Sequence, residues 1–217
     1  MTLTINLKKK RGSAKDRAMS EDEYQKLKDN LDKIKDKKER VILFLGARAG
    51  LRVSEIIQCR LSWLKVKKIG DKEVLEINIP NDDYDIRNPR KRWYVKNTAR
   101  EKKNKQRSTY MFNPDEYNEV LSFYMYNPKG VNVSRQHITS NIVRKRFSKL
   151  ISRNDDNHLT AHSLRATAQN YLYYVMNLDA KFIAVVLGHE DIKTTMTHYN
   201  TMNKASAESY LINIINQ

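Results

Sequence analysis

The sequence has little cysteine and no long hydrophobic run. Its one cysteine, Cys59, has no partner for an internal disulfide and excludes a cysteine-rich metal site. No apolar stretch reaches the length that crosses a membrane. No apolar segment follows the basic residues at the N-terminus, so we expect no secretory signal there. Together these absences indicate a cytoplasmic protein in a reducing setting.

Acidic residues are missing from two stretches that are rich in lysine and arginine. The chain carries 41 Lys/Arg against 25 Asp/Glu, a net charge of +16. Residues 86–107 hold ten basic residues and one acid, and residues 135–153 hold six basic residues and no acid. Residues 154–217 are nearly neutral, with four basic and six acidic residues. This excess predicts nucleic acid or an anionic surface as the partner, contacted by the first two thirds of the chain.

Local signals predict one domain with appendages, which is what the length of 217 residues favours. Residues 1–19 read as a basic arm that is disordered or that orders on a phosphate backbone. Ser20 and Glu23 form a capping box that starts a helix. Residues 40–49 are apolar nearly all round, which predicts a buried helix that Gly50 ends.

The middle of the chain predicts strands and then further helices. Alternation over 63–79 indicates a β-hairpin that turns at Gly70-Asp71, and 92–98 and 107–112 are typical of two more strands. Three later helices are signalled by the Asn113-Pro114 start, by Ser134 and by Asp179. The helix after Ser134 has a basic outer face, which we interpret as tracking phosphates. Another helix carries His162 and Arg165, and an apolar helix is predicted to begin at about residue 203.

One stretch near the C-terminus carries the residues with the most chemistry. His162 and Arg165 are three positions apart, so on a helix they share one face. An arginine fork matches two oxygens of a phosphate, and histidines donate or move protons near neutral pH. Gly188 and His189 end an apolar run, and Tyr199 follows ten residues later. Because a tyrosine can attack phosphorus, the cluster predicts phosphoryl transfer on a nucleic acid without a metal.

Arg52 is a charged residue set between two apolar segments. An unpaired charge in that setting costs free energy. Taken alone, it is best explained by a surface ion pair between Arg52 and Glu55. A place in the phosphate-binding site is the alternative.

The motifs follow one another in an order that resembles a known family. They are AGLRVSEI at 49–56, a basic β-hairpin, HSLR at 162–165, LGHEDIKTT at 187–195 and Tyr199. From Ser20 onward the sequence resembles the catalytic domain of the tyrosine recombinase (phage integrase) family, in an archaeal or viral form. The resemblance implies a mixed α+β fold, mostly α-helical, with a small antiparallel β-sheet on one side. It also implies a catalytic domain over 20–202 and a C-terminal helix over 203–217, docked on its own body or swapped into a neighbour.

The resemblance also implies a role for each site residue. Arg52 and Arg165 would grip the scissile phosphate, His162 and His189 would complete the cradle, and Glu55 would orient Arg52. Tyr199 would form a 3′-phosphotyrosyl link and release a 5′-hydroxyl. The general acid would be a lysine of the β-turn, Lys102 in the register that fits best, with Lys96, Lys103 and Lys105 as alternatives. The residues expected to contact DNA are Arg90, Lys91, Arg92, Lys96, Lys103, Lys105, Arg107, Arg144 and Lys145.

The function that this resemblance implies is site-specific recombination or integration of double-stranded DNA for a virus or mobile element. The reaction would need no metal, cofactor or ATP, and would run in dimers or tetramers on DNA in the host cytoplasm or nucleoid, with no membrane involved. DNA relaxation of the type IB kind and a catalytically silent DNA-binding protein of the same fold are the alternatives. The family's usual N-terminal core-binding domain has no counterpart here, so we expect either a catalytic fragment or a reduced recombinase.

Overall fold

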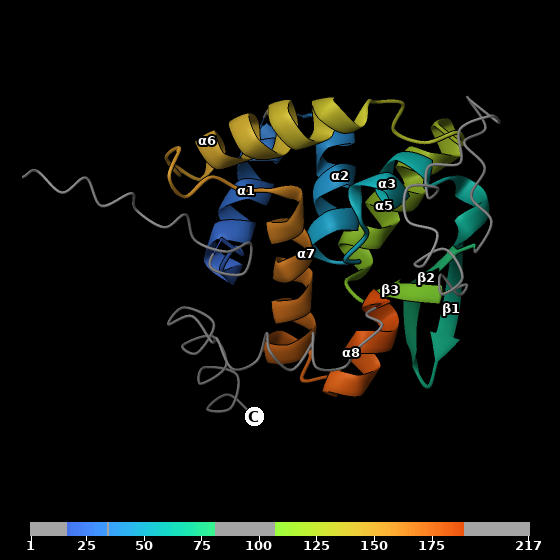
Figure 1. Cartoon of the computed structure of the whole chain (residues 1–217). Coiled ribbons are helices and arrows are strands. Elements are labelled where there is room, and N and C mark those ends of the chain that lie inside the picture. The colour runs from blue at the N-terminus through green and yellow to red at the C-terminus, as the bar shows by residue number, and fades with distance from the viewer. Residues whose placement is uncertain (1–16, 34, 81–106, 189–217) are drawn as a thin grey trace, which may run out of the picture.

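The structure, a computed structural model, describes residues 17–33, 35–80 and 107–188. Helices make up most of it, and a three-stranded sheet lies at one side (Figure 1). In chain order the elements are α1 (Glu21–Lys33), α2 (Lys37–Ala47), α3 (Val53–Gln58), the 3-10 turn η1 (Leu61–Trp63), β1 (Leu64–Ile69), β2 (Lys72–Ile79), β3 (Arg107–Met111), α5 (Pro114–Tyr126), the π-helix η2 (His137–Phe147), α6 (Ser148–Leu150), α7 (Ala161–Asn170), the π-helical turn η3 (Tyr171–Val175) and α8 (Ala180–Leu187). The predicted fold class, mostly helical with a small antiparallel sheet, is confirmed.

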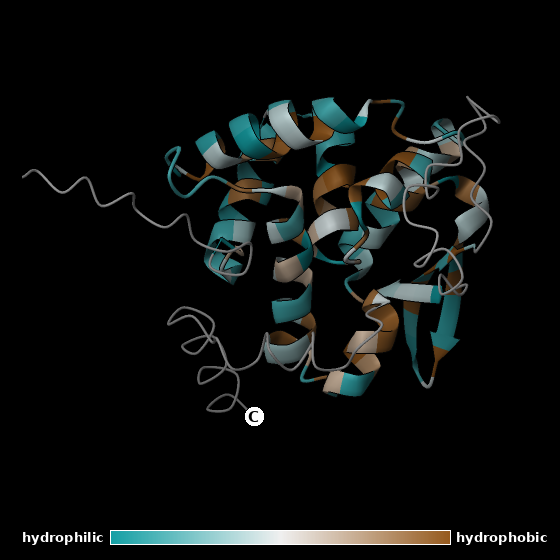
Figure 2. Ribbon diagram, in the orientation of Figure 1, coloured by the Kyte–Doolittle hydropathy of each residue, from teal (hydrophilic) through white to brown (hydrophobic). Residues whose placement is uncertain are grey.

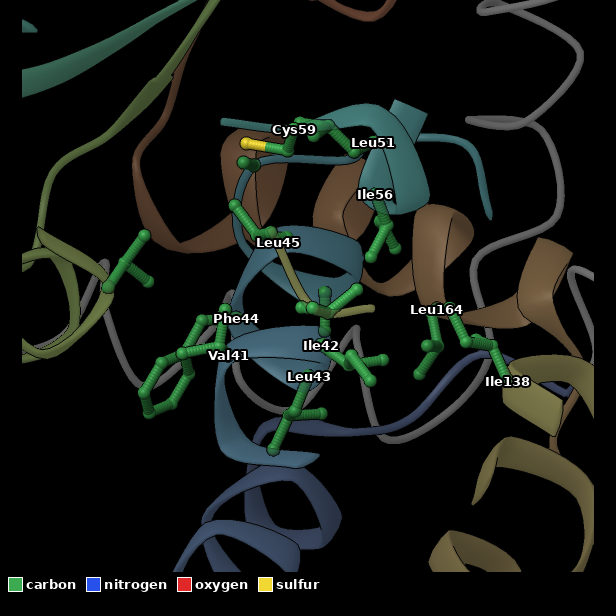
Figure 3. Close-up of a cluster of buried hydrophobic side chains, with 14 of the residues drawn as sticks. Val41, Ile42, Leu43, Phe44, Leu45, Leu51, Ile56, Cys59, Ile138 and Leu164 are labelled. Carbon is green, nitrogen blue, oxygen red and sulfur yellow. The ribbon is translucent and has the colours of Figure 1, made fainter. Parts of the chain in front are cut away.

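Helix α2 is the centre of the core. Every residue from Glu39 to Ala47 is buried, as the uniformly apolar stretch predicts. Its side chains share one buried cluster with residues of α3, α7 and η2, and Figure 3 shows Ile42 of α2, Leu164 of α7 and Ile138 of η2 within this cluster. A helix buried on all sides fixes its neighbours, so α2 sets the position of the segments that follow it.

The sheet is antiparallel with the order β1-β2-β3. The β1–β2 hairpin pairs Ile69 with Lys72 around Gly70, as predicted. Strand β3 pairs with β2 from Ile79↔Arg107 to Leu75↔Met111, and α8 packs beside β3. Figure 2 shows α8 mostly in the hydrophobic colour, consistent with its packing on this side of the body. The sheet therefore brings Arg107 next to the end of α8.

The predicted helix starts are confirmed by hydrogen bonds. Glu23 and Ser20 exchange both bonds of the capping box. Asn113 accepts from the backbone at the start of α5, Ser134 Oγ accepts from the backbone N–H of His137, and Asp179 caps α8. These signals are local, which is why the sequence alone carries them.

The end of α2 differs from the prediction. The helix ends at Ala47 rather than directly before Gly50, and Arg48 is its C-cap. Gly50 does have a left-handed backbone, with φ +67, and its Cα lies so close to Leu187 that a Cβ there would be 2.3 Å from Leu187 Cδ2. Gly50 thus serves both the helix end, where the backbone N–H of Leu51 donates to the carbonyl of Leu45 at 2.9 Å, and the close contact with α8.

The last residues of the predicted arm pack on the body. Ala18 and Met19 are buried, and the backbone N–H of Met19 donates to Thr167 Oγ1 of α7. Arg153 donates to the carbonyls of Arg17 and Ala18. The packed body therefore begins before Ser20. The rest of the predicted arm, the strand predicted at 92–98 and the helix predicted at 203–217 lie outside the described residues.

No helix in the described part of the chain is both long and apolar enough to cross a membrane.

Candidate active site

Glu55 is a buried carboxylate that holds two arginines. Its side chain is 2% exposed, on the first turn of α3. Oε1 accepts from Arg52 Nη1 at 3.0 Å, and Oε2 accepts from the Arg52 backbone N–H at 2.6 Å. The ion pair between Arg52 and Glu55 that the spacing predicts is present, but its carboxylate is buried and not on the surface.

The second arginine on Glu55 is Arg107, the first residue of β3. Its Nη2 donates to Glu55 Oε2 at 2.7 Å, and its Nη1 donates to the carbonyl of Val186 near the end of α8. Its side chain is 10% exposed. We expected Arg107 among the residues that contact DNA, and the structure instead encloses it beside Arg52.

Arg165 reaches the same place from α7. Thr160 caps α7, with Ser163 as the other half of a capping box, and this fixes the start of the helix that carries Arg165. Arg165 is 8% exposed, donates to the carbonyl of Gly50 at 2.6 Å, and donates through Nη2 to the carbonyl of Leu187. The structure thus brings Arg52 and Arg165 together, although they lie far apart in the sequence.

The three arginines meet at the carboxyl end of α8. The carbonyl of Val186 accepts a hydrogen bond from Arg107, that of Leu187 from Arg165, and that of Gly188 from Arg52 at 3.1 Å. The last carbonyls of a helix have no partner within the helix and carry the negative end of its dipole. Guanidinium groups are therefore well suited to bind the carboxyl end of α8, and these bonds hold all three arginines in place.

Charge in this cluster is predominantly positive. Burial by itself raises the pKa of Glu55, but Arg107, Arg52 and Arg165 together outweigh it, so the pKa of Glu55 lies below its ordinary value. Glu55 is therefore a carboxylate at neutral pH. Three arginines against one carboxylate leave an excess of positive charge at the surface where Arg52 emerges, since the Arg52 side chain is 40% exposed.

His162 is exposed in the first turn of α7, one turn before Arg165. Lys102, His189 and Tyr199 lie outside the described residues. His189 directly follows Gly188, whose carbonyl Arg52 holds. The structure therefore places Arg52, Glu55, His162 and Arg165, and its described part ends at Gly188, directly before His189 in the sequence.

The expected DNA contacts are described in part. Arg144 and Lys145 are exposed on η2, on its polar face. Arg146 beside them is held by Glu39 and Asp36 across the contact with α2. The other expected contacts, Arg90, Lys91, Arg92, Lys96, Lys103 and Lys105, lie outside the described residues.

The described part of the site offers a rigid, positive cradle with an exposed arginine and an exposed histidine. Such preorganised donors stabilise an anion whose charge grows during a reaction, and a phosphodiester is an anion of this kind. Among the described residues no group of three His, Cys, Asp or Glu is arranged to hold a metal ion.

Sequence comparison assigns the family. The model of the phage integrase family matches residues 17–206, which is most of the chain. The chain belongs to this family, the tyrosine recombinases, and the order of its motifs and its fold agree with that membership. None of the curated protein sequences matches the chain.

Solved structures with the same fold include two recombinases and an integrase. The crystal structure of XerA recombinase has a TM-score of 0.61, with 19% identity over 90% of this chain and 62% of that one. XerH site-specific recombinase bound to its difH substrate has a TM-score of 0.59, with 16% identity over 84% of this chain and 50% of that one. The Tn1549 transposon integrase in complex with transposon right end DNA has a TM-score of 0.50, with 15% identity over 91% of this chain and 66% of that one. The chain thus spans between half and two thirds of these proteins.

Proposed function

We propose that this protein breaks and rejoins double-stranded DNA through a tyrosine-linked intermediate, as a site-specific recombinase. The observation that carries the proposal is the meeting of Arg52 and Arg165 on successive carbonyls at the end of α8. Family membership supports it, and so does the net charge of +16. The exposed face of Arg52 and the exposed His162 leave a surface for one phosphodiester.

In the proposed reaction the phenolic oxygen of Tyr199 attacks the scissile phosphorus and the bond to the 5′-oxygen breaks. The phenol gives its proton to His162 and the leaving 5′-oxygen takes one from Lys102, so a 5′-hydroxyl and a 3′-phosphotyrosyl ester result. A 5′-hydroxyl from the same or a partner strand reverses the step, and the number of ester bonds is conserved. Arg52, Arg165, His162 and His189 neutralise the charge that develops on the phosphate.

We propose that the protein serves a mobile element or virus that integrates into a genome. It would act in the cytoplasm or nucleoid of the host. The exposed Arg144 and Lys145 on η2 supply contacts to the DNA backbone. Exchange of strands needs two or more protomers on the DNA, so we propose dimers or tetramers there.

The test is a suicide DNA substrate, nicked so that the released strand diffuses away, incubated with the purified chain in EDTA. We expect a covalent protein–DNA adduct on the 3′ side of the break. Tyr199→Phe should abolish it, while Tyr173→Phe, on η3, should leave it intact. An adduct that survives Tyr199→Phe rejects this nucleophile. Cleavage that needs a divalent metal identifies a nuclease of another type, and binding without any adduct identifies a DNA-binding protein of the same fold.

A further inference from the structure

Arg107 joins three separate parts of the candidate site. It donates to Glu55 on α3 and to the Val186 carbonyl on α8, while its own backbone belongs to β3. Glu55 in turn holds Arg52 by its side chain and its backbone N–H. One guanidinium therefore connects the sheet, the helix that follows Arg52 and the end of α8.

The stem of Arg107 also lies against the backbone of Gly188. A Cβ placed on Gly188 would be 2.6 Å from Arg107 Cδ and 2.9 Å from its Nε. Only a residue without a side chain fits so close to the arginine. Gly188 also supplies the carbonyl that accepts from Arg52. Arg107 therefore packs against the residue to which Arg52 donates.

Burial separates Arg107 from a direct role on the phosphate. Its side chain is 10% exposed, against 40% for Arg52, and both of its terminal nitrogens already donate to the protein. A guanidinium placed in this way acts on the substrate through the groups it holds. It donates to Oε2 of Glu55, the same oxygen that accepts from the Arg52 backbone N–H.

We propose that Arg107 is a positioning residue of the active site, which locks Glu55 and the end of α8 in place and thereby sets the direction of Arg52. This inference rests on the proposed function. Lysine cannot replace it, because a single ammonium has no fork to span Glu55 and the Val186 carbonyl at once. Without the guanidinium of Arg107, the side chain of Arg52 keeps its charge and loses its fixed direction.

The test compares Arg107→Lys with Arg40→Lys. Arg40 is an equally enclosed arginine, 10% exposed, and it holds Asp32 and Glu119 far from the cluster on Glu55. Both changes keep the charge and remove a buried fork. For each variant, thermal unfolding, DNA affinity and the single-turnover rate of adduct formation on the suicide substrate are measured.

We expect Arg107→Lys to slow adduct formation by roughly 10- to 100-fold with DNA affinity nearly unchanged, since a small misplacement of a catalytic group costs that much. Arg40→Lys should lower the unfolding temperature and leave the rate of the folded protein unchanged. Equal rates for wild type and Arg107→Lys overturn the inference and leave the proposed function standing. Absence of an adduct with the wild-type protein rejects the proposed function and the inference with it.

A pH profile separates positioning from general loosening of the fold. The charged groups that face Glu55 are Arg107 from β3, Arg52 before α3 and Arg165 from α7. In Arg107→Gln, Glu55 loses one of these cations, so the acidic limb of the rate profile should move to higher pH. In the double variant Arg107→Gln/Glu55→Gln this move should vanish. A shift that persists without Glu55 overturns the mechanism proposed for Arg107.

Discussion

Gly188 is the residue at which backbone conformation and side-chain contact coincide. Its φ of +63 is left-handed, as expected for a residue that ends a helix, and Arg107 occupies the space beside its Cα. Gly188→Ala should therefore lower the free energy of unfolding by about 1–2 kcal/mol from backbone strain alone, and displace Arg107 as well. We expect a slower rate of adduct formation in addition to the lower stability, measured by urea unfolding and the suicide substrate.

Gly70→Ala provides the matched control for that change. Gly70 has nearly the same backbone, with φ +60, and no atom lies within 4 Å of where its Cβ would be. Its variant should show the loss of stability without the loss of rate. If both alanines slow the reaction equally, the contact between Gly188 and Arg107 has no part in the site.

Individual residues show where sequence reasoning succeeds and where it stops. Ser20, Asn113 and Asp179 announce helix starts because a cap acts within three residues of itself. Arg107 is predicted to contact DNA because it belongs to the basic stretch 86–107. Its carboxylate partner is 52 positions away, and no local pattern shows that β3 carries it there. The resemblance to a family, and no local pattern, predicts that Arg52 and Arg165 share one site, and in the structure both side chains reach the end of α8.

At the scale of elements, the contact between α2 and η2 contains a buried carboxyl group, Glu39, whose charged form is disfavoured. Glu39 is 6% exposed on α2, and Arg146 Nε of η2 lies 2.8 Å from its Oε2. Burial and the charge of Asp36 raise the pKa of Glu39 to about 7, against the pull of Arg146. An acid whose pKa is higher when folded stabilises the fold below its unfolded pKa of 4.5, and that stability is lost as pH rises through 7.

Glu39→Gln should remove this dependence. Between pH 5 and 8, the loss of unfolding free energy should be smaller than in the wild type by about 2–3 kcal/mol, as urea unfolding at the two pH values would show. Arg146→Gln should act the other way, because it removes the one cation that lowers the pKa of Glu39. An Arg146→Gln variant with a flatter pH dependence than the wild type would contradict this assignment.

At the scale of the whole molecule, the buried core and the charged surface have separate tasks. The core around α2 includes residues of α3 and α7, and a second buried cluster packs α8 against η3. Together they bring three arginines from distant parts of the chain to one helix end. The surface carries the net charge of +16. Binding to DNA should therefore depend on salt, whereas the geometry of the arginine cluster should not, because buried pairs are screened much less than exposed ones.

The salt dependence can be assigned to η2 by two double variants of equal charge. Each lysine or arginine that neutralises a phosphate releases counterions, so log Kd changes with log salt by about 0.9 per contact. Arg144→Gln/Lys145→Gln should lower this slope by about 1.8, measured by fluorescence anisotropy between 50 and 200 mM salt. Lys33→Gln/Lys129→Gln removes the same charge from exposed positions on α1 and in the turn after α5, and should change the slope much less. Equal effects of the two variants would mean that DNA responds to net charge alone, and η2 would then lose its role as a phosphate-tracking face.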